Sequence, residues 1–142
     1  MIKGLEHTAL SVSDIDRSVA FYCENFQMTV DRSMECGADT LLGKVTGMKG
    51  CVARIVHLRK GSAMLELFEY KFPEGRDIPG DFKQADHGFT HLGFSSDDVR
   101  ADYRTLLGRG VRFISEPVEF RPSVWVVYFY GPDGEVCELR QS

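Results

Sequence analysis

The stretch GLEHTALSVSD at residues 4–14 returns as GFTHLGFSSDD at residues 88–98. Both copies keep an opening glycine, a histidine three residues later, a serine and a closing aspartate. Recurrence at such a distance is typical of a duplicated structural unit, which decides the fold class before any single element is considered. A second pair of segments agrees, because MLELF at residues 64–68 and VCELR at residues 136–140 both place a glutamate inside a short apolar run.

Each copy predicts the same order of elements, in which a short strand with the histidine leads into a capped helix and three further strands follow. Apolar residues share one helical face over residues 15–22 and again over residues 99–107. The expected helix caps are Asp14 or Ser13 in the first half and Ser96 or Asp97 in the second. The expected later strands lie at residues 27–33, 52–58, 64–68, 111–115, 124–130 and 136–140.

The two halves therefore predict an α+β protein made of two tandem βαβββ modules in a single domain. Module one spans residues 1–70, a linker with prolines and glycines spans 71–86, and module two spans 87–142. The two glutamates are closer together in sequence than the two histidines. An insertion at residues 36–50, with an extra helical turn around residues 40–45, explains the difference.

Composition limits the possible partners. A chain of 142 residues with 43% hydrophobic and 27% charged residues is typical of one globular domain. A net charge of −4 and the lack of a basic cluster argue against nucleic acid. No apolar run approaches the roughly 20 residues that cross a bilayer, and no signal-peptide pattern opens the chain. We expect a cytoplasmic protein that binds a small molecule.

The repeat also predicts a metal site. Side chains alternate across a strand, so Glu66 points where Met64 and Phe68 point. A lone carboxylate among apolar groups costs several kcal/mol or becomes protonated, and a cation removes that cost. Because histidine and glutamate recur at matched places, we expect one divalent cation, which we take to be Zn, Ni, Co, Mn or Fe. Its predicted ligands are His7, Glu66, His91 and Glu138.

The other polar and aromatic residues favour structural roles. His57 has no histidine counterpart in the second half, and His87 would lie about 13 Å from His91 along a straight strand, so both are expected to be structural or surface residues. The aromatic side chains of residues 125–130 are expected in the core more than in a cleft. Arg121 is expected in a solvated loop, with contact to an anionic substrate as the alternative.

Four motifs resemble the vicinal oxygen chelate superfamily, which includes glyoxalases, methylmalonyl-CoA epimerases, bleomycin resistance proteins and extradiol dioxygenases. The motifs are LEHTAL at residues 5–10, MLELFE at 64–69, FTHLGF at 89–94 and GPDGEVCEL at 131–139. The resemblance implies curved sheets that form a cleft around the metal, and a homodimer. It also implies the ligand order His, Glu or Gln, His, Glu, which His7, Glu66, His91 and Glu138 fill.

The resemblance further implies a glyoxalase-like lyase or isomerase that acts on a substrate with vicinal oxygens through a metal-stabilised, enolate-type intermediate. A carboxylate then moves a proton next to a carbonyl, with Glu138 as the base and Glu66 as its near-symmetric counterpart. The small bacterial glyoxalases contact glutathione through an arginine and an asparagine. Ser11 and Tyr70 stand at those places, which argues against a glutathione hemithioacetal.

Two alternatives remain. An extradiol dioxygenase needs only both histidines and the last glutamate around Fe(II), which would leave Glu66 superfluous. A drug-binding resistance protein with the same cleft would need none of the four ligands. Methylmalonyl-CoA epimerases carry an acid shortly before the third strand, where this chain has Gly50 and Cys51.

Overall fold

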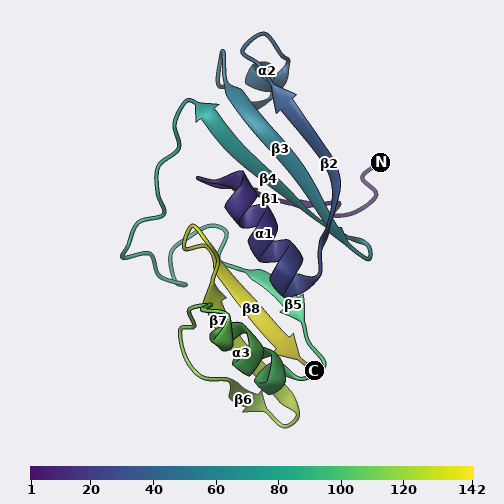
Figure 1. Ribbon diagram of the computed structural model, residues 1–142, viewed down its shortest axis with the longest axis vertical. Coiled ribbons are helices and arrows are strands. Elements are labelled where there is room, and N and C mark those ends of the chain that lie inside the picture. The colour runs from purple at the N-terminus through teal and green to yellow at the C-terminus, as the bar shows by residue number, and fades with distance from the viewer. The chain divides into compact units, whose positions relative to one another are not determined.

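The computed structural model describes all 142 residues, and the chain divides into two compact units, Met1–Arg76 and Asp77–Ser142 (Figure 1). Each unit is built from one four-stranded sheet with one helix of at least ten residues against it. No helix in either unit has the length and apolar character needed to cross a membrane.

The first unit contains six elements. They are β1 (Thr8–Ser11), α1 (Ile15–Phe26), β2 (Thr29–Cys36), α2 (Leu42–Thr46), β3 (Val52–Lys60) and β4 (Ala63–Phe72). The strand order in the sheet is β1-β4-β3-β2, with β1 parallel to β4 and the other neighbours antiparallel. The short α2 falls in the segment where the sequence predicts an insertion.

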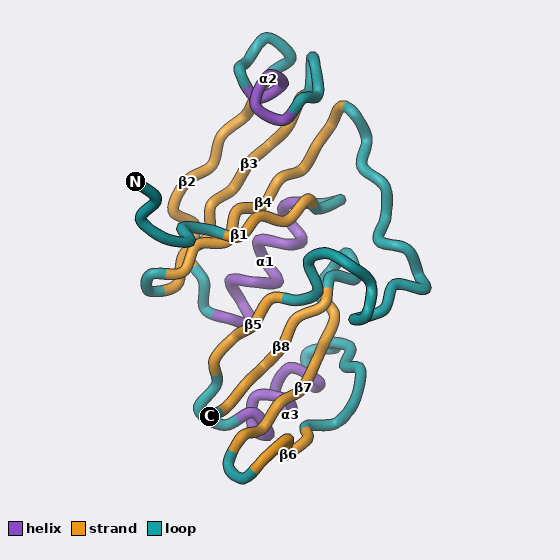
Figure 2. Tube along the Cα trace, turned by 180° about the vertical axis from the view of Figure 1, so that it is seen from behind, coloured by secondary structure: helices purple, strands orange, loops and turns teal.

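The second unit repeats this plan without the insertion. It contains β5 (Leu92–Ser95), α3 (Val99–Gly108), β6 (Val118–Arg121), β7 (Val124–Tyr130) and β8 (Val136–Gln141). The strand order is β5-β8-β7-β6, again with the first strand parallel to its neighbour (Figure 2). The predicted α+β class and the two βαβββ modules are confirmed.

In the first unit α1 covers one face of the sheet. Asp14 caps the helix by accepting from the backbone N–H of Arg17 at 3.0 Å, as predicted. The buried face of α1 meets the apolar residues of β3 and β4 that point toward it, and Arg54 of β3 reaches Asp16 on the helix at 2.8 Å. The side chains buried in this layer are Ile15, Tyr22, Phe26, Val56, Leu58, Leu65 and Leu67. The opposite face of the sheet is left without a helix.

Two local predictions for the second half are wrong. Residues 111–115 do not form a strand: the backbone of Phe113 makes only an isolated bridge with Phe129, and the centroid of its ring lies 4.6 Å from that of Tyr103. The strand lies later, at β6. The cap of α3 is Asp98, and Ser96 instead accepts from the backbone N–H of Asp98 at 3.1 Å.

Candidate functional site

Glu66 lies in the middle of the first sheet, on the face that α1 does not cover. Its neighbours across the strands are Ala9 of β1 and His57 of β3. Leu65 and Leu67 on either side of it point to the opposite face and are buried there. The Glu66 side chain is only 16% exposed, so its charge has little water to stabilise it.

His7 faces the Glu66 carboxylate with its Nε2 atom. Nε2 lies 3.3 Å from Oε2 of Glu66, a contact that is not a hydrogen bond, while Nδ1 lies 3.1 Å from Oε2 of Glu6. Because an ionised carboxylate only accepts, Nδ1–H of His7 donates to Glu6. In a neutral ring Nε2 then carries the lone pair, and it lies 3.3 Å from the Glu66 carboxylate with no hydrogen bond between them.

His57 is the residue that sequence reasoning missed in this unit. Its Nε2 lies 2.7 Å from Oε1 of Glu66, and its side chain is only 15% exposed. The atom is buried, yet its orientation gives it no hydrogen-bond partner. Of the two roles expected for His57, structural or surface, the surface role is wrong, because His57 is largely buried and contacts the carboxylate oxygen that His7 leaves free.

The second unit repeats the arrangement around Glu138. Its cross-strand neighbours are Gly93 of β5 and Tyr128 of β7, and its side chain is 15% exposed. The buried side chains of β7 and β8 that point to the other face are those of Val127, Phe129, Cys137 and Leu139. Glu138 therefore points to the face without α3, as Glu66 points away from α1.

His91 is oriented by residues before β5. Nδ1 lies 3.3 Å from Oε1 of Gln84 and 3.1 Å from Oγ1 of Thr90, while Nε2 lies 3.7 Å from Oε2 of Glu138. The amide nitrogen of Gln84 donates to the Thr90 carbonyl at 3.3 Å, so the amide oxygen faces the ring and accepts from Nδ1–H. In a neutral ring Nε2 of His91, which lies 3.7 Å from Oε2 of Glu138, then carries the lone pair, as Nε2 of His7 does.

These spacings suit donors that share a cation. Two ligand atoms each about 2.1 Å from one ion lie roughly 3.0–3.4 Å apart at angles of about 90–109°. The separation of 3.3 Å in the first unit falls in this range, and the separation of 3.7 Å in the second exceeds it slightly. Imidazole and carboxylate are also common ligands of first-row transition metals.

Each unit brings together one of the predicted histidine–glutamate pairs, and in the first unit His57 is a second histidine beside Glu66. Within the units no three or more His, Cys, Asp or Glu side chains form a group that could hold a metal ion. The single four-ligand site of His7, Glu66, His91 and Glu138 stays a prediction. His87 is exposed, and all four cysteines are free thiols, of which Cys51 and Cys137 are buried.

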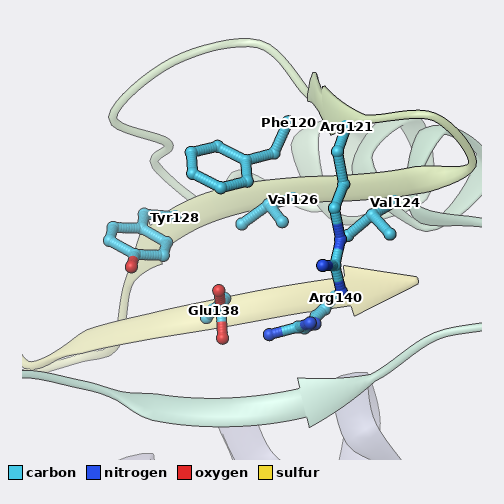
Figure 3. A pocket seen from close by; sticks show the side chains of 7 residues that line it. All are labelled: Phe120, Arg121, Val124, Val126, Tyr128, Glu138 and Arg140. Carbon is cyan, nitrogen blue, oxygen red and sulfur yellow. The ribbon is translucent and has the colours of Figure 1, made fainter. Parts of the chain in front are cut away.

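A pocket of about 360 Å³ opens beside Glu138 on the helix-free face of the second sheet (Figure 3). Its lining residues are Phe120, Arg121, Val124, Val126, Tyr128, Glu138 and Arg140. Two expectations change here, because Tyr128 lines the pocket and Arg121 is the last residue of β6 with its side chain at the pocket wall. Because side chains alternate along a strand, Tyr128 shares a face with Val124 and Val126, and this alternation could have predicted its place in the pocket.

Tyr128 contributes a proton donor to this pocket. Burial raises the pKa of its phenol, and the negative charge of Glu138 raises it further. Its ring centroid lies 5.0 Å from that of His91. In the first unit burial likewise raises the pKa of Tyr70, with smaller contributions from Cys51, Cys36 and Glu66. Both phenols therefore keep their protons at neutral pH.

Comparison with known proteins gives consistent results. The sequence model described as "Glyoxalase/Bleomycin resistance protein/Dioxygenase superfamily" matches residues 4–139. A 2-epi-5-epi-valiolone epimerase from Actinomyces sp. is 31% identical over 96% of this chain and 78% of its own length. The uncharacterized protein YwbC of Bacillus subtilis (strain 168) is 29% identical over 99% of both chains. A solved glyoxalase family protein from Bacillus cereus has the same fold, with a TM-score of 0.88 at 18% identity, over 99% of this chain and 94% of its own.

Proposed function

This chain belongs to the Glyoxalase/Bleomycin resistance protein/Dioxygenase superfamily, and from that membership we propose that it is a divalent-metal-dependent isomerase or lyase. Its substrate is a small molecule with neighbouring oxygens, and the reaction moves a proton at a carbon next to a carbonyl. The observation that carries the proposal is the repeated pair. In both units a histidine held at Nδ1 brings its Nε2 atom to 3.3 or 3.7 Å from the carboxylate of a poorly solvated glutamate.

The four side chains His7, Glu66, His91 and Glu138 hold the cation together. When bound, such an ion supplies electrostatic stabilisation for negative charge that develops on the substrate oxygens. The fixed Nδ1 contacts keep both imidazoles in the tautomer that ligates a metal, so little reorganisation is needed for binding. The homodimer is part of the same proposal.

Glu138 is the proton-transferring base. It lines the pocket, beside the apolar wall where a small molecule would lie. Its carboxylate takes the proton from the carbon and, in an isomerisation, returns it to the neighbouring atom. In an epimerisation a second acid or solvent gives a proton to the opposite face, and Glu138 releases its own proton to solvent, so that atoms and charge balance over the cycle. Tyr128 lines the same pocket and keeps its proton, so its hydroxyl donates a hydrogen bond to an oxygen of the bound substrate.

The relative from Actinomyces supports the isomerase branch of this proposal. Its name describes an epimerase, and it is 31% identical to this chain over nearly the whole of it. An epimerisation next to a carbonyl needs the same base and the same stabilisation of negative charge. We therefore place epimerisation first among the proton-transfer reactions.

Elemental analysis of protein purified without added metal tests the cation. We expect about one transition-metal ion per chain, lost in His7→Ala and in Glu66→Ala. If Glu66→Ala keeps its full metal content while His7→Ala loses it, a three-ligand site of the dioxygenase type replaces the proposed one. Metal-free wild-type protein that gains no metal on addition of Zn²⁺, Ni²⁺, Co²⁺, Mn²⁺ or Fe²⁺ would favour the drug-binding alternative.

Proton transfer is then measured without knowledge of the natural substrate. Metal-loaded protein in D₂O is incubated with small α-hydroxy ketones and 2-oxo acids, and exchange of the C–H next to the carbonyl is followed by NMR. We expect exchange with at least one compound class and none with Glu138→Gln. Robust oxygen consumption with catechols and no C–H exchange would refute the isomerase assignment.

A further inference from the structure

We propose that Arg121 and Arg140 form an anion subsite in the pocket beside Glu138, and that the molecule bound there carries a carboxylate or phosphate group. Anion binding at this subsite does not depend on the proposed function. Only the statement that the bound anion is the substrate rests on it. The subsite itself follows from the pocket, which lies wholly within the second unit.

The two arginines border the pocket from opposite sides of β7. Arg140 follows Glu138 by two residues on β8 and pairs in register with Val126, so both side chains share a face. Arg121 ends β6 and pairs with Val124. Figure 3 shows the Arg121 side chain reaching from β6 across β7 toward Arg140, and the Arg140 side chain directed toward Glu138.

Neither guanidinium has a partner within the chain. Both residues are exposed, and the structure gives their guanidinium groups no hydrogen bond, ion pair or aromatic contact. Glu138 does not neutralise them, since its one ion-pair contact is with His91 at 3.7 Å. Arg54 and Arg59, by contrast, contact carboxylates at 2.8 Å, and Arg100 and Arg112 lie over aromatic rings.

An anion with several oxygens is the ligand that this arrangement suits. The planar guanidinium presents N–H groups in a fork that matches a carboxylate or a phosphate, and such charge-assisted hydrogen bonds are stronger than neutral ones. The ammonium group of a lysine is a point charge and would distinguish less well between ligands of different shape. Two such forks at one pocket wall therefore select for oxyanions over neutral hydroxyl compounds.

The rest of the pocket limits the size of the molecule. The remaining wall is apolar or aromatic, from Phe120, Val124, Val126 and the Tyr128 ring. A volume of about 360 Å³ is at the low end for ligand sites, which indicates a small metabolite. The Cα atoms of residues two apart on a strand are about 7 Å apart, so the anionic group lies a few bonds from the atoms that face Glu138.

Calorimetric titration tests the subsite with phenyl phosphate, phenylacetate and benzyl alcohol, which share a ring and differ in charge. The chain is titrated as purified and again after metal removal with EDTA. We expect at least one of the two anions to bind ten times more tightly than benzyl alcohol in both preparations. Binding of only phenyl phosphate or only phenylacetate identifies which oxyanion the subsite takes.

Matched variants locate the binding. Arg121→Gln and Arg140→Gln should each weaken anion binding about tenfold, while Arg140→Lys keeps the charge and loses less. Arg100→Gln removes the same charge from the opposite face of β7, where Arg100 covers Trp125, and should change the affinity by less than twofold. Circular dichroism spectra confirm that each variant is folded.

Two results would overturn the subsite: benzyl alcohol that binds as tightly as both anions, or an Arg100→Gln variant that loses as much affinity as Arg140→Gln. Because the titration is repeated without metal, its outcome is independent of the cation site. A chain that binds the anions and no metal would keep the subsite and refute the proposed reaction.

Discussion

Replacing His57 with alanine should weaken the binding of Co²⁺ by about 10- to 100-fold, which corresponds to about 1.4–2.7 kcal/mol. The reason is that the two oxygens of the Glu66 carboxylate contact different histidines. Oε2 lies 3.3 Å from His7, and Oε1 lies 2.7 Å from His57. If Oε2 ligates the cation, His57 is the group that holds Oε1 in place.

The structure also indicates why His57 favours the loaded site. Its Nε2 is buried and has no hydrogen bond in the present orientation of the carboxylate. A buried polar atom without a partner costs about 1–3 kcal/mol. If a bound cation changes the orientation of Glu66 so that Nε2 of His57 gains a hydrogen bond to Oε1, cation binding recovers part of this free energy.

Titration with Co²⁺, followed by calorimetry and by the visible absorption of the bound ion, measures the effect. His87→Ala is the control, because His87 is exposed and should leave the dissociation constant within twofold. His57→Gln restores a side-chain N–H donor and should recover part of the loss. If His57→Ala lowers the melting temperature of metal-free protein but leaves the Co²⁺ affinity and spectrum unchanged, His57 is a packing residue and the reasoning is refuted.

Three further predictions concern the scaffold. Leu67→Ala empties a fully buried position between α1 and the sheet and should lower the free energy of unfolding by about 2–5 kcal/mol in urea, whereas exposed Leu41→Ala should change it by less than about 0.5 kcal/mol. Asp14→Ala removes the cap of α1 and should cost about 1 kcal/mol in the same assay. A Cβ at Gly93 would lie 3.4 Å from Oε2 of Glu138, an ordinary contact, so Gly93→Ala should keep metal affinity while the larger Gly93→Val weakens it in calorimetry.

The fold was predictable because two features of the sequence, the duplicated motifs, can be recognised without knowledge of how the side chains pack. A duplicated histidine motif and a duplicated glutamate strand identify two equal modules, and strand parity places Glu66 and Glu138 on one defined face of each sheet. The prediction of a strand at residues 111–115 is wrong because apolar residues there suit a strand as well as they suit a loop that packs its side chains into the core. Phe113 instead fills space between α3 and β7, and nothing in a local sequence window distinguishes these two uses.

His57 was missed because its counterpart is of another residue type. No histidine occupies the matching place in the second half, but what brings a side chain beside Glu66 is the register of the β3–β4 hairpin. That register follows from the tight turn at Gly61, where φ is +58°, with Lys60 opposite Ala63. Counting back from this turn places residue 57 opposite residue 66, so the hairpin geometry contained a signal that residue-type matching did not use.

The difference between the two halves predicts unequal roles for the two glutamates. Glu66 has an imidazole across the strand, which suits a fixed ligand, whereas Glu138 has Tyr128 across the strand and lines a pocket of about 360 Å³. At equal metal occupancy, Glu138→Gln should lower the C–H exchange rate by at least about 100-fold, the contribution of a general base. Glu66→Gln should weaken metal binding but keep exchange within about tenfold once metal is saturating. If Glu66→Gln loses more exchange than Glu138→Gln under that condition, the base is on the first module, and the pocket beside Glu138 does not mark the reacting carbon.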